Sequence, residues 1–274
     1  MYELDTAYHR IRVVDRDGIR FLMFERRQQG SMYLADPFGT DFAYPAYFHI
    51  ALALAPAAAR TLAVGLGAGM VVKRMWRDYP EMRIDAVELD PDVVQIAQER
   101  FALPDDERIR VFTGDGRAFI EAARENWDIV IVDAYDDDHI PRPLTTEEFM
   151  REVRDHLSSD GVAVYNFLGQ VEGRDSRPFR SLHRTLSNVW RRVWVFRVHS
   201  LEADLLDLDH NIIILATDAN VSRSELLERI ASRVGGRVTV PDFEMFGEDL
   251  HSGRIRMRDV PLLVDEAHGK RSRR

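Results

Sequence analysis

The sequence predicts an α/β fold, in which a Rossmann-like, mainly parallel sheet follows a small N-terminal β domain. Two observations predict the sheet. Short apolar runs typical of buried strands alternate with amphipathic stretches typical of helices between residues 60 and 167. A glycine-rich turn at residues 65–69 separates the first of these strands from the first of these helices. A third observation, an apolar–polar alternation over residues 8–35, predicts the N-terminal β domain.

The N-terminal β domain carries a hairpin signal at residues 15–18. Apolar and polar residues alternate on both sides of this segment, and its last two residues are Asp-Gly. That dipeptide favours a two-residue hairpin loop. We place the domain at residues 1–41, because a helix is predicted over residues 42–55, ending near Pro56.

Residues 42–264 are expected to form the Rossmann-like catalytic domain. The predicted strands lie at 61–64, 84–88, 109–112, 127–132 and 162–167, with helices at 70–79, 91–101, 116–123 and 145–157 between them. This βαβ spacing favours parallel strands with right-handed crossovers. A turn is predicted at 158–161, a helix at 181–190, an edge pair of strands at 193–198 and 212–216, and a late helix at 221–234. The basic tail, residues 265–274, is expected to be disordered.

Composition limits the function. The chain has 274 residues, 45% of them apolar, and a net charge of −9, which disfavours non-specific nucleic-acid binding and suits a cationic small molecule. The absence of cysteine excludes disulfides and thiolate chemistry. The polar first residues predict no signal peptide, and the apolar stretch 50–72 is broken by Pro56 and Arg60. We therefore expect a cytoplasmic protein with no membrane partner.

The glycine turn and the strand that follows it predict a nucleoside site. Gly65, Gly67 and Gly69 would let the backbone approach a ligand at a helix N-terminus. Glu88 ends the second strand, where a Rossmann-type site places a carboxylate on ribose hydroxyls. The alternatives are a tight turn without a ligand and a capping or surface glutamate. The order of the features favours the site.

The third predicted strand ends near Asp115 and Gly116. In open α/β sheets, ligands bind along the carboxyl ends of the strands, so Asp115 could accept a hydrogen bond from an adenine amino group. A Gly-Asp-Gly sequence is also an ordinary turn, and for Asp115 alone the two interpretations are nearly balanced.

The fourth predicted strand ends at Asp133, and an acidic loop continues from there through Asp138. Partial burial and like-charge neighbours such as Asp136 would raise the pKa of Asp133 and make it a candidate base. A solvated acidic loop is the alternative. A metal site with His139 has no clear ligand pattern, so no metal is predicted. The stretch 199–210, rich in His and Asp, is interpreted as a surface loop.

Together these motifs resemble the polyamine aminopropyltransferase family, that is, spermidine synthase and its relatives. The resemblance runs from about Tyr8 to Phe167 and includes the glycine turn, Glu88-Leu89-Asp90, Gly114-Asp115-Gly116 and Asp133-x-x-Asp136. It also includes the segments 106–111 and 145–149 and the N-terminal β domain. It implies a sheet of the S-adenosylmethionine-dependent methyltransferase type and a homodimer or homotetramer.

The resemblance implies transfer of an aminopropyl group from decarboxylated S-adenosylmethionine to an amine. In the nucleoside half of the site, Glu88 would bind the ribose and Asp115 the adenine, while Gln29 matches a family site glutamine. In the amine half, Asp133 would take the proton from the attacking amine. The residues expected to hold the amine are Asp136, Tyr44 and Tyr135.

Several residues depart from the family pattern. Ala68 stands where the family's glycine turn carries an aspartate that resembles a clamp for the aminopropyl amine, and His9 stands where the family usually has glutamine. Pro45 and Ala46 replace polar residues after the site tyrosine. Without an acid at position 68, the carboxylate of ordinary S-adenosylmethionine would not be repelled. Two alternatives therefore stay open: a methyltransferase on the same fold, and a non-catalytic nucleoside or polyamine binder.

Overall fold

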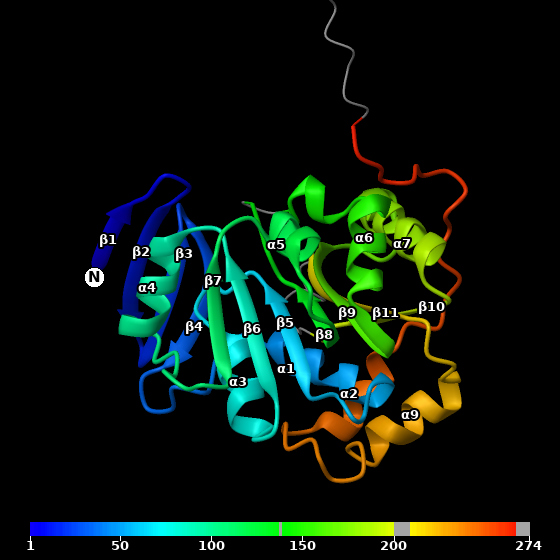
Figure 1. Ribbon diagram of the computed structural model, residues 1–274, viewed down its shortest axis with the longest axis horizontal. Helices are drawn as coiled ribbons and strands as arrows, with labels where there is room; N and C mark the ends of the chain where they lie inside the picture. Colours follow the sequence, from blue (N-terminus) through cyan, green and yellow to red (C-terminus); the bar gives the residue numbers. More distant parts are fainter. Residues whose placement is uncertain (137–138, 200–208, 267–274) are drawn as a thin grey trace, which may run out of the picture.

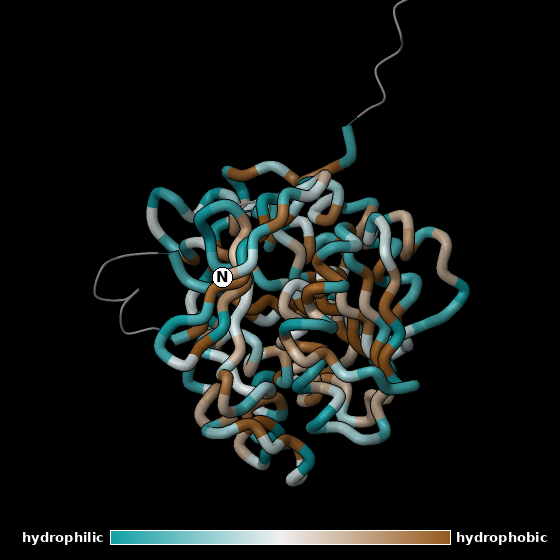
Figure 2. Tube along the Cα trace, turned by 90° about the vertical axis from the view of Figure 1, so that its left-hand side faces the viewer, coloured by the Kyte–Doolittle hydropathy of each residue, from teal (hydrophilic) through white to brown (hydrophobic). Residues whose placement is uncertain are grey.

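The computed structural model describes residues 1–136, 139–199 and 209–266 and contains two sheets (Figure 1). The first has four antiparallel strands in the order β1-β2-β3-β4. The second has seven strands in the order β10-β11-β9-β8-β5-β6-β7. In Figure 2 apolar segments gather in the interior of the trace, while hydrophilic segments form most of the outer loops.

The N-terminal sheet confirms the predicted β structure and its hairpin. Its strands are β1 (Tyr2–Asp5), β2 (Arg10–Arg16), β3 (Ile19–Phe24) and β4 (Arg27–Tyr33). Asp17 and Gly18 join β2 to β3 with φ angles of 52° and 79°, as a type I′ turn requires. Strand β1 lies before the predicted start at residue 8, because its four residues are too few to show a pattern alone. The domain boundary after residue 41 remains a prediction.

The seven-stranded sheet is mainly parallel, as predicted. β5 (Arg60–Val64), β6 (Arg83–Glu88), β7 (Ile109–Thr113), β8 (Trp127–Val132) and β9 (Leu157–Gly169) form its parallel part. β11 (His210–Thr217) pairs antiparallel with β9, and β10 (Arg192–Arg197) pairs antiparallel with β11 at the edge. The predicted edge pair is therefore confirmed.

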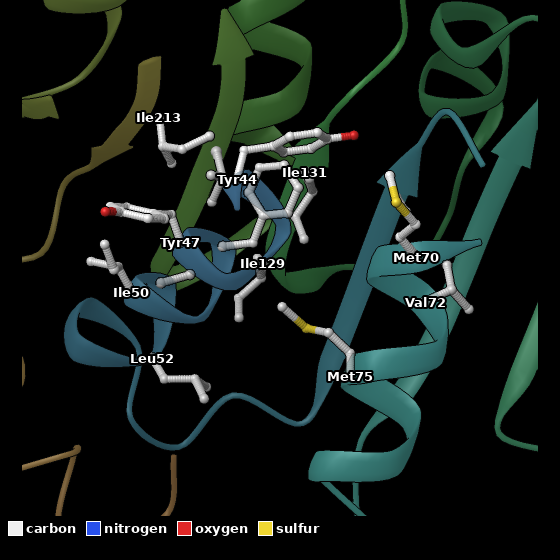
Figure 3. Packing of buried hydrophobic residues seen from close by; sticks show 14 of the residues in the cluster. Tyr44, Tyr47, Ile50, Leu52, Met70, Val72, Met75, Ile129, Ile131 and Ile213 are labelled. Atoms are coloured by element: carbon white, nitrogen blue, oxygen red, sulfur yellow. The ribbon is translucent and has the colours of Figure 1, made fainter. Parts of the chain in front are cut away.

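Helices cover both faces of this sheet. A buried apolar cluster lies on each face. One cluster contains side chains of α5 (Gly116–Ala122), α6 (Glu147–Asp155) and α7 (Arg177–Val189). The other contains side chains of α3 (Met70–Asp78), α4 (Pro91–Arg100) and α9 (Arg223–Ala231), together with the segment 44–54. Figure 3 shows this second cluster, in which Tyr44 and Met75 approach the sheet residues Ile129 and Ile131. Short 3₁₀ helices lie at η2 (Arg142–Leu144), η3 (Arg174–Ser176) and η4 (Phe243–Asp249).

The predicted helix over residues 42–55 is divided into three short pieces. They are α1 (Tyr44–Tyr47), the 3₁₀ turn η1 (Phe48–Ile50) and α2 (Ala51–Leu54). Nearly all of these side chains are buried, so tertiary packing and not one amphipathic face fixes the segment. No helix in the described ranges is both long and apolar enough to cross a bilayer.

The turn predicted at residues 158–161 is wrong, because these residues lie inside β9 as an irregularity. Trp127 pairs with Leu157 and Ile129 already pairs with Val162, so the extra residues bulge outward from the ladder. Ser158 Oγ donates a hydrogen bond of 2.8 Å to Asp128 on the neighbouring strand and fixes the bulge.

Two further predictions need correction. His210 belongs to β11 and is only 4% exposed, so it is not part of a surface loop, whereas residues 200–208 lie outside the described residues. In the predicted disordered tail, Asp265 is fixed by Arg117, whose Nη1 and Nη2 donate hydrogen bonds of 2.7 and 2.8 Å to it. Residues 267–274 lie outside the described residues.

Candidate active site

A cavity of about 310 Å³ lies at the carboxyl ends of the parallel strands. It brings together every predicted site residue except Gly69: Gln29, Tyr44, Gly65, Gly67, Glu88, Asp115, Gly116, Asp133, Tyr135 and Asp136. The remaining wall includes side chains of the N-terminal sheet and of the η2 region, namely Tyr8, His9, Phe24, Pro141, Pro143 and Leu144. The topology explains this meeting point, since the ends of adjacent parallel strands share one edge of the sheet.

The glycine turn needs glycine for different reasons at its different positions. At Gly65, with φ of 97°, a Cβ atom would lie 2.4 Å from the carbonyl oxygen of Asp133. Gly67 also has a positive φ, 52°, and lines the cavity. Gly69 does not line it: this residue is the N-cap of α3, and a Cβ there would meet Leu103 Cδ1 at 3.1 Å. Gly69 therefore has a packing contact in the structure, and its assignment to the ligand stays a prediction.

Glu88 is held by the backbone of the turn. Its Oε2 accepts hydrogen bonds from the amides of Leu66 (2.9 Å) and Gly67 (3.3 Å), and its Oε1 accepts one from the amide of Asp90 (3.1 Å). A carboxylate offers about four accepting sites, so the fixed side chain can still accept a hydrogen bond from a ligand hydroxyl.

Asp115 and Gly116 begin helix α5. Asp115 is its N-cap, and its Oδ1 accepts a hydrogen bond of 2.8 Å from the amide of Ala118. A Cβ at Gly116 would lie 2.6 Å from Val64 Cγ1, so glycine allows α5 to approach the sheet closely. The second carboxylate oxygen of Asp115 is left for the cavity.

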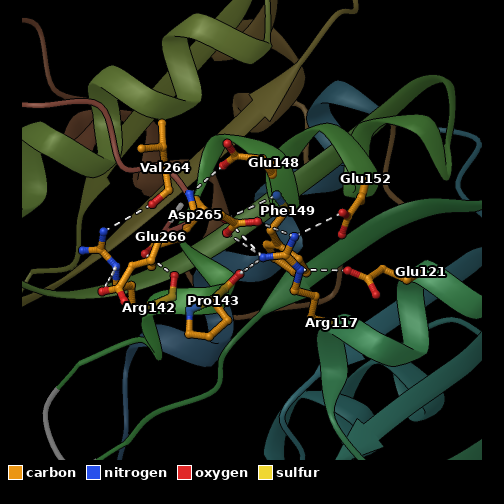
Figure 4. Close-up of polar contacts among 12 residues, drawn as sticks. Arg117, Glu121, Arg142, Pro143, Glu148, Phe149, Glu152, Val264, Asp265 and Glu266 are labelled. Carbon is orange, nitrogen blue, oxygen red and sulfur yellow. Dashed lines mark hydrogen bonds and ion pairs between the residues drawn. The ribbon is translucent and has the colours of Figure 1, made fainter. Parts of the chain in front are cut away.

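Arg117 ties this helix to the rest of the fold. Besides its two bonds to Asp265, it donates to Glu121 (2.9 Å) and to Glu152 (3.3 Å) on α6 (Figure 4). The amide of Asp265 donates to Glu148 at 2.9 Å. The segment around residue 265 thus crosses α5 and α6 beside the η2 region, whose Pro143 lines the cavity.

Asp133 follows β8 and is partly buried. Its Oδ1 accepts a hydrogen bond of 2.9 Å from Asn166 Nδ2, and its Oδ2 accepts a long one of 3.3 Å from the Tyr44 hydroxyl. Burial raises the pKa of Asp133 to about 6, while the hydrogen bonds from Asn166 and Tyr44 act in the opposite direction. The raised pKa was predicted. Its cause among the described residues is burial and not the like charge of Asp136.

The two tyrosines differ in what their hydroxyls do. Tyr44 is 7% exposed and points its hydroxyl at Asp133, whereas the Tyr135 hydroxyl donates to the carbonyl oxygen of Asn166 at 2.9 Å. Tyr135 therefore lines the cavity but directs its hydroxyl toward β9. Burial raises the pKa of both tyrosines well above the ordinary value, so both stay protonated near neutral pH.

Asn166 is a site residue that the sequence reasoning missed. It is 2% exposed, lies near the end of β9 and donates to Asp133. The signal was available, because a polar residue near the carboxyl end of a buried parallel strand obeys the same rule that selected Asp133.

Of the residues that depart from the family pattern, only His9 lines the cavity in the described parts of the chain. Ala68 is 1% exposed, and a Cβ placed on Gly30 would lie 2.7 Å from the Ala68 methyl, so this methyl packs against β4. Pro45 is buried in α1. His9 stacks on Phe24 with ring centroids 4.2 Å apart, and both line the cavity. In the described parts of the chain, no group of three or more His, Asp or Glu side chains is arranged to hold a metal ion.

The fold is shared by spermidine synthases and methyltransferases. It aligns with a probable spermidine synthase from Corynebacterium glutamicum over 98% of each chain, with a TM-score of 0.75 and 19% identity. It also aligns with human methyltransferase-like protein 13 in complex with SAH, over 77% of this chain and 93% of that chain, with a TM-score of 0.56 and 21% identity. At such identities the likeness establishes the fold alone, and it confirms the predicted α/β class.

Sequence similarity identifies the family. The spermine/spermidine synthase domain matches residues 43–196. A polyamine aminopropyltransferase of Vibrio vulnificus is 32% identical over 193 residues, which cover 66% of this chain and 64% of that relative. The chain belongs to the spermine/spermidine synthase domain family, which confirms the resemblance. Because it spans less than two thirds of the length of that curated relative, the activity and the substrates do not follow from the match alone.

Proposed function

We propose that this protein transfers an aminopropyl group from decarboxylated S-adenosylmethionine to an amine, with Asp133 as the base. The observation that carries the proposal is the Asp133 carboxylate: it lies in the same cavity as Glu88 and Asp115 and is partly buried, with a pKa of about 6. A general base works best when its pKa lies near the operating pH.

The chemistry follows from the state of the acceptor. An amine is protonated near neutral pH and is not a nucleophile until a base removes a proton. Asp133 would accept that proton, and the freed nitrogen would attack the carbon bonded to the sulfonium. The new C–N bond forms as the C–S bond breaks, and methylthioadenosine leaves. Asp136 and Tyr44 line the cavity beside Asp133 and would hold the amine in line with that carbon.

The charge of the cavity favours the decarboxylated nucleoside. Four carboxylates line it, those of Glu88, Asp115, Asp133 and Asp136, and no Lys or Arg side chain in the described parts of the chain does. The sulfonium and ammonium groups of decarboxylated S-adenosylmethionine suit such a lining. The carboxylate of ordinary S-adenosylmethionine would meet only like charge there.

Methyl transfer is the second candidate, and the observation in its favour is Ala68. No acid at this position opposes the carboxylate of S-adenosylmethionine. Yet Ala68 does not line the cavity, because its methyl packs against β4. The four carboxylates that line the cavity therefore favour aminopropyl transfer more strongly than the missing acid at position 68 favours methyl transfer.

One assay separates the candidates. The purified protein is incubated with decarboxylated or with ordinary S-adenosylmethionine, each with a mixture of diamines and polyamines, and the products are identified by mass spectrometry. Methylthioadenosine with an aminopropylated amine supports the proposal. S-adenosylhomocysteine from the ordinary nucleoside would replace it with methyl transfer, and binding without either product would favour a non-catalytic binder.

We further infer a cytoplasmic homodimer or homotetramer that needs no metal ion. The family resemblance supports the assembly, and the lack of a metal-ligand pattern in the sequence supports the metal-independent chemistry. Light scattering on the eluting protein measures the assembly, and full activity in excess chelator tests the metal requirement. A monomer, or activity lost to the chelator and restored by one metal, would contradict these inferences.

A further inference from the structure

Two asparagine side chains form a hydrogen-bonded chain behind Asp133. Asn211 Nδ2 donates to Asn166 Oδ1 at 3.0 Å, and Asn166 Nδ2 donates to Asp133 Oδ1 at 2.9 Å. We propose that Asn211 is a positioning residue for the base: it holds the Asn166 amide in the orientation whose NH₂ group faces Asp133. This inference rests on the proposed role of Asp133 as the base.

The orientation matters because the two ends of an amide have opposite hydrogen-bonding character. An ionised carboxylate only accepts hydrogen bonds, so it needs the NH₂ end of Asn166 and is repelled by the oxygen end. Rotating the amide by half a turn would exchange these ends at almost no steric cost. Asn166 is 2% exposed, so bulk water does not reach the amide to correct the exchange.

The backbone of Asn166 is already fixed, so only its side-chain amide is still free to rotate. Its backbone pairs with Ile213 in the β9–β11 ladder, and its carbonyl oxygen accepts the hydrogen bond from Tyr135. Donation from Asn211 to Oδ1 removes the remaining freedom, because only an oxygen can accept there.

The strand register places Asn211 where it can do this. In the antiparallel pair, Asn211 lies opposite Leu168, and Asn166 is two residues from Leu168 on the same strand face. Diagonal neighbours of this kind lie within reach of side-chain contact. Asn211 is partly buried and is not among the described residues that line the site cavity.

The hydrogen bonds from Asn211 to Asn166 and from Asn166 to Asp133 affect the ionisation of Asp133. A hydrogen bond donated to a carboxylate stabilises its charged form, and the bond from Asn166 lowers the pKa that burial has raised. Loss of that bond would move the titration of Asp133 to higher pH. The titratable groups that share the cavity with Asp133 are Tyr8, His9, Tyr44, Glu88, Asp115, Tyr135 and Asp136. On β11, His210 neighbours Asn211 and interacts with Arg197.

The test compares Asn211→Leu and Asn211→Asp with Asn188→Asp, a control on the exposed face of α7. Leucine removes the donor without adding charge. Aspartate presents an acceptor to Asn166 and favours the wrong amide orientation. We expect the acidic limb of kcat/KM to move up by about half a pH unit in Asn211→Leu and further in Asn211→Asp. Nucleoside affinity should not change, and the control should match the parent protein.

A double-mutant cycle shows whether Asn211 acts through Asn166. If it does, Asn211→Leu produces no further shift once Asn166→Ala is present. Shifts that add in the double variant, or an acidic limb that stays in place while activity falls evenly at all pH values, would overturn the inference and leave Asn211 with a structural role.

A readout without turnover separates this inference from the proposed function. Carbon-13 NMR of the aspartate carboxyl groups follows the titration of Asp133, whose signal is assigned by its absence in Asp133→Asn. An upward shift in Asn211→Leu supports the inference even if the protein transfers no aminopropyl group. An unchanged titration in an active enzyme overturns the inference and leaves the proposed function intact.

Discussion

The nucleoside half and the amine half of the cavity differ in how their polar groups are held. Glu88 is fixed by three backbone amides, and Asp115 by the amide one turn into its own helix. Asp133 is instead held by the side chains of Asn166 and Tyr44, which come from distant parts of the chain. One half is therefore held by backbone amides of the segment 66–118, and the other by side chains that the tertiary fold brings to Asp133. The predictions below test this contrast.

The largest effect is expected from Asp133→Asn, which removes the base. Turnover should fall by about 10²- to 10⁴-fold, the range that a general base contributes, while nucleoside affinity stays unchanged. Asp160→Asn, at an exposed position in the β9 bulge, is the matched control. Rate measurements and calorimetry report the two quantities. Activity equal to that of the control would show that Asp133 is not the base. Both halves of the cavity would then serve binding alone.

Gly65→Ala should disturb both halves of the cavity, because Gly65 belongs to the glycine turn and packs against the backbone of Asp133. The new methyl would lie 2.4 Å from the carbonyl oxygen of Asp133, at a φ of 97°. We expect the free energy of unfolding to fall by about 2–4 kcal/mol. Gly18→Ala is the control, because its φ of 79° is also positive but nothing lies within 4 Å of the added methyl. There we expect about 1 kcal/mol. Equal losses in denaturant unfolding would mean that the contact with Asp133 is not a constraint.

Glu88→Gln should affect the nucleoside half alone. The substitution replaces an acceptor by an NH₂ group that faces backbone donors, so we expect nucleoside binding to weaken by about tenfold. The rate at saturating nucleoside should change little, because Glu88 and Asp133 have separate hydrogen-bond partners. Glu81→Gln, at an exposed position, is the control. An unchanged dissociation constant by calorimetry would show that Glu88 serves the turn and not the ligand.

The smallest effect concerns stability and pH. Asp133 has a higher pKa in the folded protein, about 6, than its ordinary value of 3.8. The folded state therefore binds the proton more tightly, and the stability linked to Asp133 falls as pH rises from about 4 to about 6. Asp133→Asn should then raise the free energy of unfolding by about 1 kcal/mol at pH 8 relative to the parent and should not do so at pH 4. Chemical denaturation at the two pH values measures this, and a gain that is the same at both would contradict the buried-carboxylate interpretation.

The same contrast explains what the sequence could predict. Glu88 and Asp115 stand next to their motifs, and their partners are a few residues away or in the adjacent turn. The mainly parallel direction of the strands followed from periodicity and βαβ spacing, and the edge pair was also predicted. These features are local, so a single sequence contains them.

The misses are of the opposite kind. Asn166 and Asn211 meet only through the β9–β11 register. Tyr44 was predicted as a site residue, but its hydrogen bond to Asp133 was not. The bulge at residues 158–161 reads locally as a turn, and only pairing with β8 makes it part of a strand. The proximity of Gly69 to Leu103 is likewise a tertiary contact that the glycine motif does not predict. Asn166 itself obeys the rule that selected Asp133, but its contact with Asn211 and the bulge depend on strand register, which a single sequence does not show.

The antiparallel pairing of β9 with β11 also bears on how the protein folds. The chain is synthesised from its N-terminus, so strands β5 to β8 are available for pairing before β11. A folding intermediate in which strands β5 to β8 have assembled would already possess the glycine turn, Glu88 and Asp115. It would lack the support that β11 gives to Asn166. Such a species would possess the groups expected to hold the nucleoside before it possessed the support of the base, and a nucleoside that binds it would stabilise it against unfolding.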